Sequence, residues 1–208
     1  MNEKPSLLIV FVKNIKLGKV KTRLAKTIGD DAAFEVYKKL VSITEKASTD
    51  IDIEKRIYFS QSIVESQWEG LSKHVQHGAD LGERMKNAFQ QAFSDGYSKV
   101  ILIGSDLPDM NADVLKDAFS ELENKDVVIG PAEDGGYYLV GMQKEDFYIF
   151  DDMPWRQSDL LLETKAKLDK NRANYAMLTT MNDIDTEEDL RASSFYGFLT
   201  RGLINLTL

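Results

Sequence analysis

Several predicted turns of this chain contain aspartate residues whose carboxylates could bind a metal ion. Residues 100–103 form an apolar run that ends at Gly104 and is followed by Asp106 and Pro108. Such a run is typical of a strand buried on both faces of a parallel sheet. Because open α/β sheets bind ligands at the carboxyl ends of their strands, Asp106 is a candidate ligand for a divalent cation. Alternatively, Ser105 or Asp106 caps the next helix.

A second pair of carboxylates lies near the end of the chain, in the sequence Asp183-Ile184-Asp185. Alternation along an extended backbone points the two aspartates to the same side, where they could share one hard cation. The alternative is that they belong to the cap of a helix opening at Thr186, where Asp189 completes the spacing of a capping box. The two interpretations are compatible with each other.

A basic loop follows the first predicted strand, over residues 13–24. A glycine-containing loop of this kind can surround a phosphate group with backbone N–H groups while lysine and arginine neutralise its charge. The spacings G-x-x-x-x-G-K-S/T and G-x-G-x-x-G are both absent, so neither a P-loop nor a Rossmann dinucleotide site is predicted. The candidate phosphate-binding residues are Lys13, Gly18, Lys21, Thr22 and Arg23.

Two further turn segments combine charge with glycine. Asp80 is typical of a helix N-cap and Arg84 follows in the first turns, so the pattern is explained by a helix start alone. In the segment Asp134-Gly135-Gly136 the glycines permit close approach of a ligand to the backbone, although a plain hairpin loop explains them equally well. Asp80, Arg84, Gly135 and Gly136 are retained as candidates for nucleotide binding, and Asp134, together with Asp106, as a candidate catalytic carboxylate.

Composition excludes several classes of function. The chain has 208 residues, no cysteine and a net charge of −8. Without cysteine there is no disulfide, thiolate zinc site or cysteine nucleophile, and the negative charge argues against a nucleic-acid partner. The apolar run over residues 7–12 is too short for a signal peptide or a membrane span, so we expect a cytoplasmic location without a membrane partner. No repeat or linker divides the chain, and one domain over residues 1–208 is expected.

The predicted elements alternate between strands and helices. Strands are predicted over residues 7–12, 56–59, 73–76, 100–103, 127–130, 137–140 and 175–178. Helices are predicted over residues 30–47, 63–68, 81–93, 112–122 and 159–168, with a last helix opening at Thr186. This alternation predicts an α/β fold, a three-layer α/β/α sandwich with a mainly parallel mixed sheet in which the turn around residues 133–136 introduces an antiparallel strand.

Taken together, the motifs resemble the DUF2064 family of glycosyltransferase-like proteins. The matching segments are Phe11-Val12-Lys13, Gly18-Lys19-Val20-Lys21-Thr22-Arg23-Leu24, Asp80-Leu81-Gly82-Glu83-Arg84-Met85, Ile103-Gly104-Ser105-Asp106-Leu107-Pro108, Gly130-Pro131-Ala132-Glu133-Asp134-Gly135-Gly136-Tyr137-Tyr138 and Asp183-Ile184-Asp185-Thr186. The resemblance implies the glycosyltransferase-A fold of nucleotide-diphospho-sugar transferases and a divalent metal near Asp106. More distantly, the pattern is similar to nucleotidyltransferases that make molybdenum guanine dinucleotide and guanylate 2-phospholactate.

The resulting hypothesis is a metal-dependent transferase with a nucleotide-activated donor. Asp106, with Asp183 or Asp185, would bind Mg²⁺ or Mn²⁺, which would stabilise the leaving diphosphate. The basic loop would hold the phosphates, and Asp134 would orient or deprotonate a hydroxyl of the acceptor.

Three functions remain open on the sequence. A nucleotide-sugar donor makes the protein a glycosyltransferase with a small-molecule acceptor, and this is the function we expect. The first alternative is a guanylyl- or cytidylyltransferase that releases pyrophosphate from a nucleotide, and the second is a nucleotide-binding protein without turnover. The apolar stretch over residues 197–208 is predicted to pack on the domain or on a second subunit of a homo-oligomer.

Overall fold

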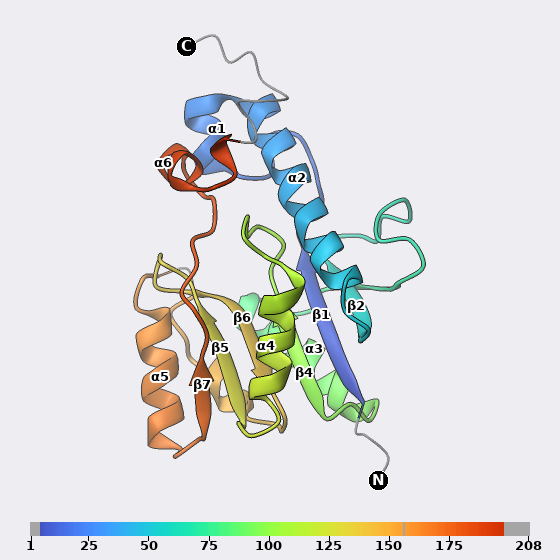
Figure 1. Cartoon of the computed structure of the whole chain (residues 1–208), viewed down its shortest axis with the longest axis vertical. Coiled ribbons are helices and arrows are strands. Elements are labelled where there is room, and N and C mark those ends of the chain that lie inside the picture. The colour runs from blue at the N-terminus through green and yellow to red at the C-terminus, as the bar shows by residue number, and fades with distance from the viewer. Residues whose placement is uncertain (1–4, 156, 198–208) are drawn as a thin grey trace.

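The computed structural model describes residues 5–155 and 157–197, which form a seven-stranded sheet with helices on both faces (Figure 1). The strands are β1 (Ser6–Val12), β2 (Glu54–Phe59), β3 (Ser72–Val75), β4 (Lys99–Ile103), β5 (Val127–Pro131), β6 (Tyr137–Met142) and β7 (Tyr175–Met177). The helices are α1 (Thr22–Ile28), α2 (Asp30–Thr49), α3 (Leu81–Ser94), α4 (Ala112–Glu121), α5 (Leu160–Lys170) and α6 (Glu187–Ala192), with a 3₁₀ helix η1 (Phe147–Phe150).

The sheet is mixed but mainly parallel, as the sequence predicts. Its order is β3-β2-β1-β4-β6-β5-β7. Strands β1, β2, β3 and β4 pair in parallel, as do β5 and β7, whereas β6 is antiparallel to both β4 and β5. The carboxyl ends of β1 and β4 therefore lie next to each other at one edge of the sheet, which is the edge where α/β sheets place ligands.

Alternating side chains of the strands form two separate cores. Leu8 and Val10 of β1 belong to a cluster with residues of α2 and α4, which lie in front of the sheet in Figure 1. Leu7 and Ile9 belong to a second cluster with residues of α3, η1 and α5 on the opposite face. The two-residue period of a strand places neighbours on opposite faces. This arrangement confirms the predicted three layers.

A third, smaller cluster lies beyond the edge of the sheet, where α1, α2 and α6 pack together (Figure 1). Three of its side chains are at most 3% exposed: Leu24 of α1, Leu190 of α6, and Ile184 in the segment before α6. Burial of three such side chains contributes several kcal/mol, on the order of 1.5–3 kcal/mol each. The packing brings the residues that precede α1 next to those that precede α6.

Two local predictions are wrong. The segment predicted as a helix over residues 63–68 consists of turns and bends, and it ends at Trp68, which is buried at a positive φ of 54°. Tertiary packing of the indole overrides the weak helical pattern there. The basic loop, predicted to extend to residue 24, ends at Lys21, because Thr22 begins α1. That helix has seven residues and one buried position, which is too little periodicity to detect in the sequence.

None of the helices in the described part of the chain is long and apolar enough to cross a membrane. Of the C-terminal stretch predicted to pack on the domain or on a partner, residues 198–208 lie outside the described residues.

Candidate functional site

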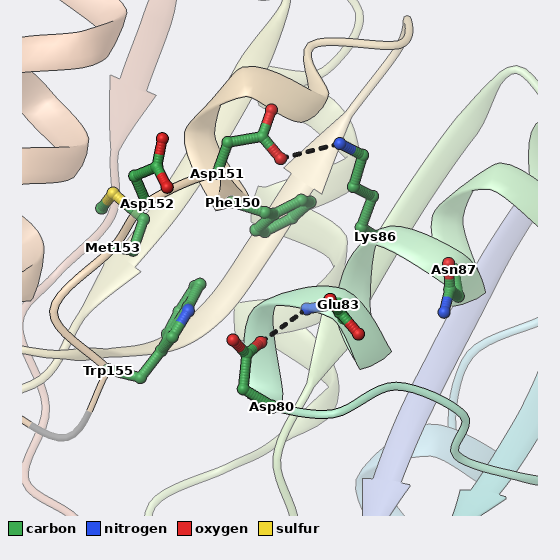
Figure 2. A pocket seen from close by; sticks show the side chains of 9 residues that line it. All are labelled: Asp80, Glu83, Lys86, Asn87, Phe150, Asp151, Asp152, Met153 and Trp155. Carbon is green, nitrogen blue, oxygen red and sulfur yellow. Dashed lines mark hydrogen bonds and ion pairs between the residues drawn. The ribbon is translucent and has the colours of Figure 1, made fainter.

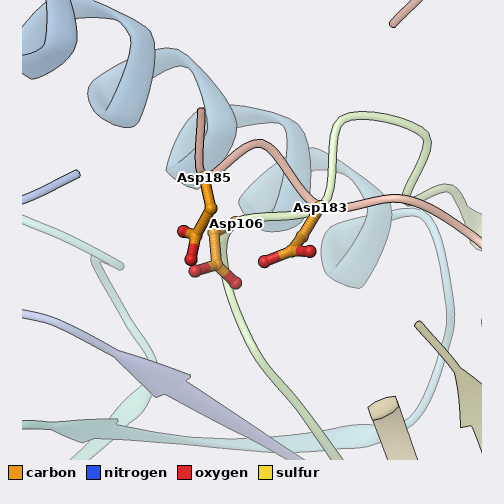
Figure 3. A group of neighbouring side chains, drawn as sticks. All are labelled: Asp106, Asp183 and Asp185. Atoms are coloured by element: carbon orange, nitrogen blue, oxygen red, sulfur yellow. The ribbon is translucent and has the colours of Figure 1, made fainter. Parts of the chain in front are cut away.

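Three aspartates meet at the carboxyl edge of the sheet. One carboxylate oxygen from each of Asp106, Asp183 and Asp185 lies within 4.8 Å of the others, and Figure 3 shows the three groups turned toward one another. Asp106 follows β4, and the other two belong to the segment between β7 and α6. The three metal ligands predicted from the sequence are therefore brought together by the fold.

Two cations of the basic loop and one from the first turn of α1 form ion pairs with two of these carboxylates. The Nζ atom of Lys21 is 3.1 Å from Oδ2 of Asp106 and 3.1 Å from Oδ1 of Asp185. Lys13 approaches Asp106 at 3.7 Å, and Arg23 approaches Asp185 at 3.7 Å. The side chain of Lys21 is 1% exposed, whereas those of Lys13 and Arg23 are 62% and 71% exposed. One cation is thus embedded in the site and two stand at its rim.

The charges of this group shift the pKa values of its members. Burial alone raises the pKa of Asp106, but the positive charges of Lys21 and Lys13 outweigh it and hold this pKa at about 2. Burial alone lowers the pKa of Lys21, and the charges of the surrounding aspartates outweigh that effect, so its pKa lies above the ordinary lysine value. Both groups are therefore ionised throughout the physiological range.

Asp183 is in the opposite situation. Burial first, and then the negative charge of Asp106, raise the pKa of Asp183 to about 6. Asp185 and Asp134 act in the same direction, and Lys21 opposes them. The ion pairs found among the described residues include none at Asp183. Its ionised form is therefore poorly compensated by the protein, and a bound cation would compensate it.

The helix-capping alternative for Asp106 is wrong for the helix that follows. The N-cap of α4 is Asn111, whose side chain accepts hydrogen bonds from the backbone N–H groups of Asp113 and Val114. Likewise Thr186 is itself the N-cap of α6, in a capping box with Asp189, as predicted. The carboxylates of Asp106, Asp183 and Asp185 are thus left for the charged group described above.

Tyr37 of α2 is a residue of the site that the sequence did not reveal. Its hydroxyl oxygen accepts a hydrogen bond from the backbone N–H of Lys13 at 3.1 Å and lies 3.2 Å from the hydroxyl of Ser105. Both Tyr37 and Ser105 are buried. The contact joins the end of β1 to the turn after β4, directly beside Asp106. In the sequence Tyr37 is only one residue of the apolar face of a helix.

The segment that carries Asp183 is attached to the turn after β5. The backbone N–H of Met181 donates to the carbonyl oxygen of Pro131, and the N–H of Glu133 donates to that of Met181, each at 3.0 Å. Asp134 follows Glu133 in this turn and is exposed. It lies close enough to Asp183 for its negative charge to raise the pKa of Asp183. Oδ1 of Asp134 accepts from the backbone N–H of Gly136 at 2.8 Å.

Gly135 has a packing function that the sequence did not distinguish from ligand approach. Its φ is +87°, and a Cβ atom there would lie 1.9 Å from the carbonyl oxygen of Ser158. Its own carbonyl accepts a hydrogen bond from Leu161 in the first turn of α5. The close approach is thus made by the protein's own backbone. Nucleotide binding at Gly135 and Gly136 stays a prediction.

Gly18 and Thr22 lie where the basic loop turns into α1. Gly18 has a φ of +70° in a turn closed by a hydrogen bond from Lys19 to Lys16. Lys21, between them, has left-handed backbone angles, with φ 47° and ψ 46°. Phosphate binding by Gly18 and Thr22 stays a prediction as well.

Asp80 and Arg84 are not joined to the acidic group by any hydrogen bond or ion pair among the described residues. Asp80 caps α3 by accepting from the N–H of Glu83 at 2.9 Å, and Nε of Arg84 donates to the carbonyl of Gly78 at 3.2 Å. Asp80 instead lines a cavity of about 670 Å³ between α3 and the segment after η1, which Figure 2 shows. Trp155 forms part of its wall, close to Asp80. Nucleotide binding by Asp80 and Arg84 stays a prediction.

The donor set at the acidic group fits a hard divalent cation. Carboxylate oxygens are the ligands that Mg²⁺, Mn²⁺ and Ca²⁺ prefer, and one oxygen of each aspartate lies within 4.8 Å of the other two. The poorly compensated charge of Asp183 is consistent with a cation there.

Comparison with solved structures agrees with the fold. A protein of Desulfovibrio desulfuricans G20, described as a "putative nucleotide-diphospho-sugar transferase", is 33% identical, with 94% of each chain covered and a TM-score of 0.82. The 4-diphosphocytidyl-2C-methyl-D-erythritol synthase of Anaerococcus prevotii is 9% identical, with 94% of this chain and 100% of that chain covered and a TM-score of 0.61. Rv0371c of Mycobacterium tuberculosis in complex with manganese is 12% identical, with 89% and 96% covered and a TM-score of 0.52. The last two show the fold alone.

No curated protein matches the sequence. A family model does: residues 43–157 match the family described as "Uncharacterized protein conserved in bacteria (DUF2064)". The matched segment contains Asp106 and Asp134. With more than half of the chain matched, and with a structural relative at 33% identity over nearly the full length of both chains, this protein belongs to the DUF2064 family and has the fold of nucleotide-diphospho-sugar transferases.

Proposed function

We propose that this protein is a divalent-metal-dependent glycosyltransferase that uses a nucleotide-diphospho-sugar and a small-molecule acceptor. The observation that carries the proposal is the group at the carboxyl edge of the sheet, where three carboxylates meet and three cations form ion pairs with two of them. Carboxylates in such proximity are suited to a metal ion, and flanking cations are suited to phosphate oxygens. A sugar diphosphate bound to a metal requires both.

In this proposal Asp106, Asp183 and Asp185 would hold Mg²⁺ or Mn²⁺, which would supply positive charge to stabilise the leaving diphosphate. Lys13 is exposed beside Asp106, and Arg23 is exposed beside Asp185. Their exposed side chains are free to turn toward phosphate oxygens, and charge-assisted hydrogen bonds to phosphate are among the strong ones.

Asp134 is proposed as the group that faces the acceptor. It is exposed, it lies near Asp183, and the hydrogen bond from Gly136 orients its carboxylate. A carboxylate in this place can accept the proton of an acceptor hydroxyl while that hydroxyl attacks the anomeric carbon. The bond between that carbon and the diphosphate oxygen breaks, and a nucleoside diphosphate leaves.

Nucleotidyl transfer is the second candidate. It is supported by the three cations that form ion pairs with Asp106 and Asp185. A triphosphate carries more negative charge than a sugar diphosphate and so needs more cations. In that reaction the acceptor attacks the α-phosphorus and pyrophosphate leaves. The same residues would serve, with the cations placed along the triphosphate. Binding of a nucleotide without turnover is the third candidate.

We also propose that the described residues form one domain, because the two large cores lie on the two faces of one sheet.

A thermal-shift screen of nucleoside triphosphates and nucleotide sugars, with and without Mn²⁺, tests the proposal. A ligand at 100 times its Kd contributes about 2.7 kcal/mol to stability. We expect stabilisation by a nucleotide sugar that depends on Mn²⁺ and is lost in Asp106→Asn. The matched control is Asp113→Asn, which alters a carboxylate with an 87% exposed side chain on α4.

Chromatography of the products then separates the three candidates. Release of a nucleoside diphosphate supports glycosyl transfer, release of pyrophosphate supports nucleotidyl transfer, and binding with neither product supports a nucleotide-binding protein. If neither metal nor nucleotide stabilises the wild type, all three candidate functions are excluded.

A further inference from the structure

We infer that Lys21 is an internal competitor of the divalent metal: its ammonium group holds Asp106 and Asp185 together, and metal binding displaces it toward the phosphates of the donor. The inference rests on the proposed function, because it concerns the metal and phosphate of the same site. Metal alone should bind weakly, and metal and diphosphate should strengthen each other's binding.

The position of Lys21 distinguishes it from the other two cations. Lys13 and Arg23 each touch one carboxylate at 3.7 Å and are largely exposed. The Nζ atom of Lys21 bridges two carboxylates at 3.1 Å each, and its side chain is 1% exposed. It therefore lies between two of the three proposed metal ligands and is shielded from solvent.

A divalent ion and this ammonium group would both be held by the carboxylates of Asp106 and Asp185. Mg²⁺ binds carboxylate oxygens at roughly 2.0–2.1 Å, closer than any ammonium group can. A metal ion held by the same two carboxylates would lie close to Nζ, and like charges repel strongly in a partly buried site. Binding of one cation to these two carboxylates therefore disfavours binding of the other.

The backbone at Lys21 is consistent with a group held in place by its side chain. Its φ of 47° and ψ of 46° lie in the left-handed region, which residues other than glycine and asparagine seldom adopt. Such angles persist where surrounding contacts impose them. The two ion pairs of the side chain are such contacts, so breaking them also removes a reason for the unusual backbone.

The displaced ammonium group needs a new partner, and a phosphate bound to the metal supplies one. A diphosphate that accepts Lys21 removes the competitor of the metal and so raises the affinity for metal. By linkage, metal raises the affinity for diphosphate by the same factor. The site would thus respond to metal and donor together and only weakly to free metal.

Calorimetric titration of Mn²⁺ into Lys21→Met tests the competition directly. Methionine keeps much of the apolar stem and removes the charge, so we expect at least tenfold tighter binding of Mn²⁺ than in the wild type when no phosphate is present. Methylene diphosphonate, a stable diphosphate, should tighten Mn²⁺ binding to the wild type and fail to do so in Lys21→Met. The matched control is Lys19→Met, an exposed lysine of the same loop, which should behave as the wild type. Equal or weaker Mn²⁺ binding by a folded Lys21→Met overturns the inference.

A second measurement uses the unaltered chain, so it does not depend on the folding of a variant. Lysine acetylation followed by mass spectrometry should show Lys21 protected in the presence of a chelator and labelled faster with saturating Mn²⁺ when no phosphate is present. Lys116, which is 61% exposed, serves as the internal reference and should not change. Unchanged or increased protection of Lys21 under conditions where Mn²⁺ stabilises the protein contradicts the inference.

The two experiments also separate this inference from the proposed function. If the wild type binds Mn²⁺ and Lys21→Met binds it no more tightly, the metal site stands and the competition falls. If Mn²⁺ binds to Lys21→Met and hardly to the wild type, the competition is supported. If neither chain binds Mn²⁺, the metal site and the competition both fall.

Discussion

Lys21 and Asp106 are 85 residues apart in the chain and form an ion pair with 3.1 Å between Nζ and Oδ2. The pair joins the loop after β1 to the turn after β4, two neighbouring strands of the sheet. The same ammonium group also reaches Asp185, 164 residues away, which ties the segment before α6 to the same point. A single buried cation therefore holds together three segments that carry the candidate site.

Asp106→Asn should abolish the stabilisation of the protein by Mn²⁺ and lower transferase activity by at least a hundredfold. The substitution removes a proposed metal ligand and one of the two partners of Lys21. Differential scanning fluorimetry with and without Mn²⁺ measures the first effect, and product release measures the second. Retained Mn²⁺ stabilisation in this variant would show that the metal site lies elsewhere.

Asp183→Asn should stabilise the metal-free protein at neutral pH. The pKa of Asp183 is raised to about 6, so the folded state favours the protonated form. Stability of the wild type therefore falls as the pH rises from about 4 to 6, and the loss persists above pH 6. The amide removes this loss, worth on the order of 1 kcal/mol after solvent screening. Melting temperatures between pH 4 and 8 should show a shallower slope for the variant, and identical slopes would contradict the assignment.

Mn²⁺ binding to the wild type should weaken below pH 6. A proton on Asp183 competes with the metal, whereas Asp106, with a pKa of about 2, stays ionised. About a tenfold lower affinity is expected at pH 5 than at pH 7, since roughly nine tenths of Asp183 is then protonated. Calorimetry at the two pH values measures the ratio, and Asp183→Asn should show little of this dependence.

Tyr37→Phe should destabilise the protein by about 1–2 kcal/mol, because it leaves the N–H of Lys13 and the hydroxyl of Ser105 without their buried partner. Tyr148→Phe is the matched control: the hydroxyl of Tyr148 is buried without a hydrogen-bond partner among the described residues, so its removal should cost little. Urea unfolding compares the two. Equal effects would show that the contacts of Tyr37 contribute nothing beyond its ring.

Gly135→Ala should cost more than 2 kcal/mol, because the new Cβ would lie 1.9 Å from the carbonyl oxygen of Ser158. Gly96→Ala is the control, since Gly96 also has a positive φ but no heavy atom within 4 Å of a built Cβ. Its expected cost is about 1 kcal/mol from backbone strain alone. A similar cost for both variants would indicate that the backbone near Ser158 moves aside easily.

Much of the site could be predicted from local patterns. Asp106 was predicted from an apolar strand that ends in a turn, and Asp183 and Asp185 from their alternation before a capping box. Local patterns could not show the function of Gly135, because a glycine that admits a ligand and one that admits the protein's own backbone look alike in sequence. They also missed α1, which is short and has little periodicity.

The sequence by itself determined the seven strands and five of the six α-helices of the described residues, because hydrophobic periodicity and caps are local properties. It also determined that acidic and basic groups follow the strands at turns. Only the tertiary structure decided that Lys21 lies between Asp106 and Asp185, and that Tyr37 connects the ends of β1 and β4. These contacts join residues that are 24 to 164 positions apart, so they depend on the order of strands in the sheet and on the packing of α1 against α6.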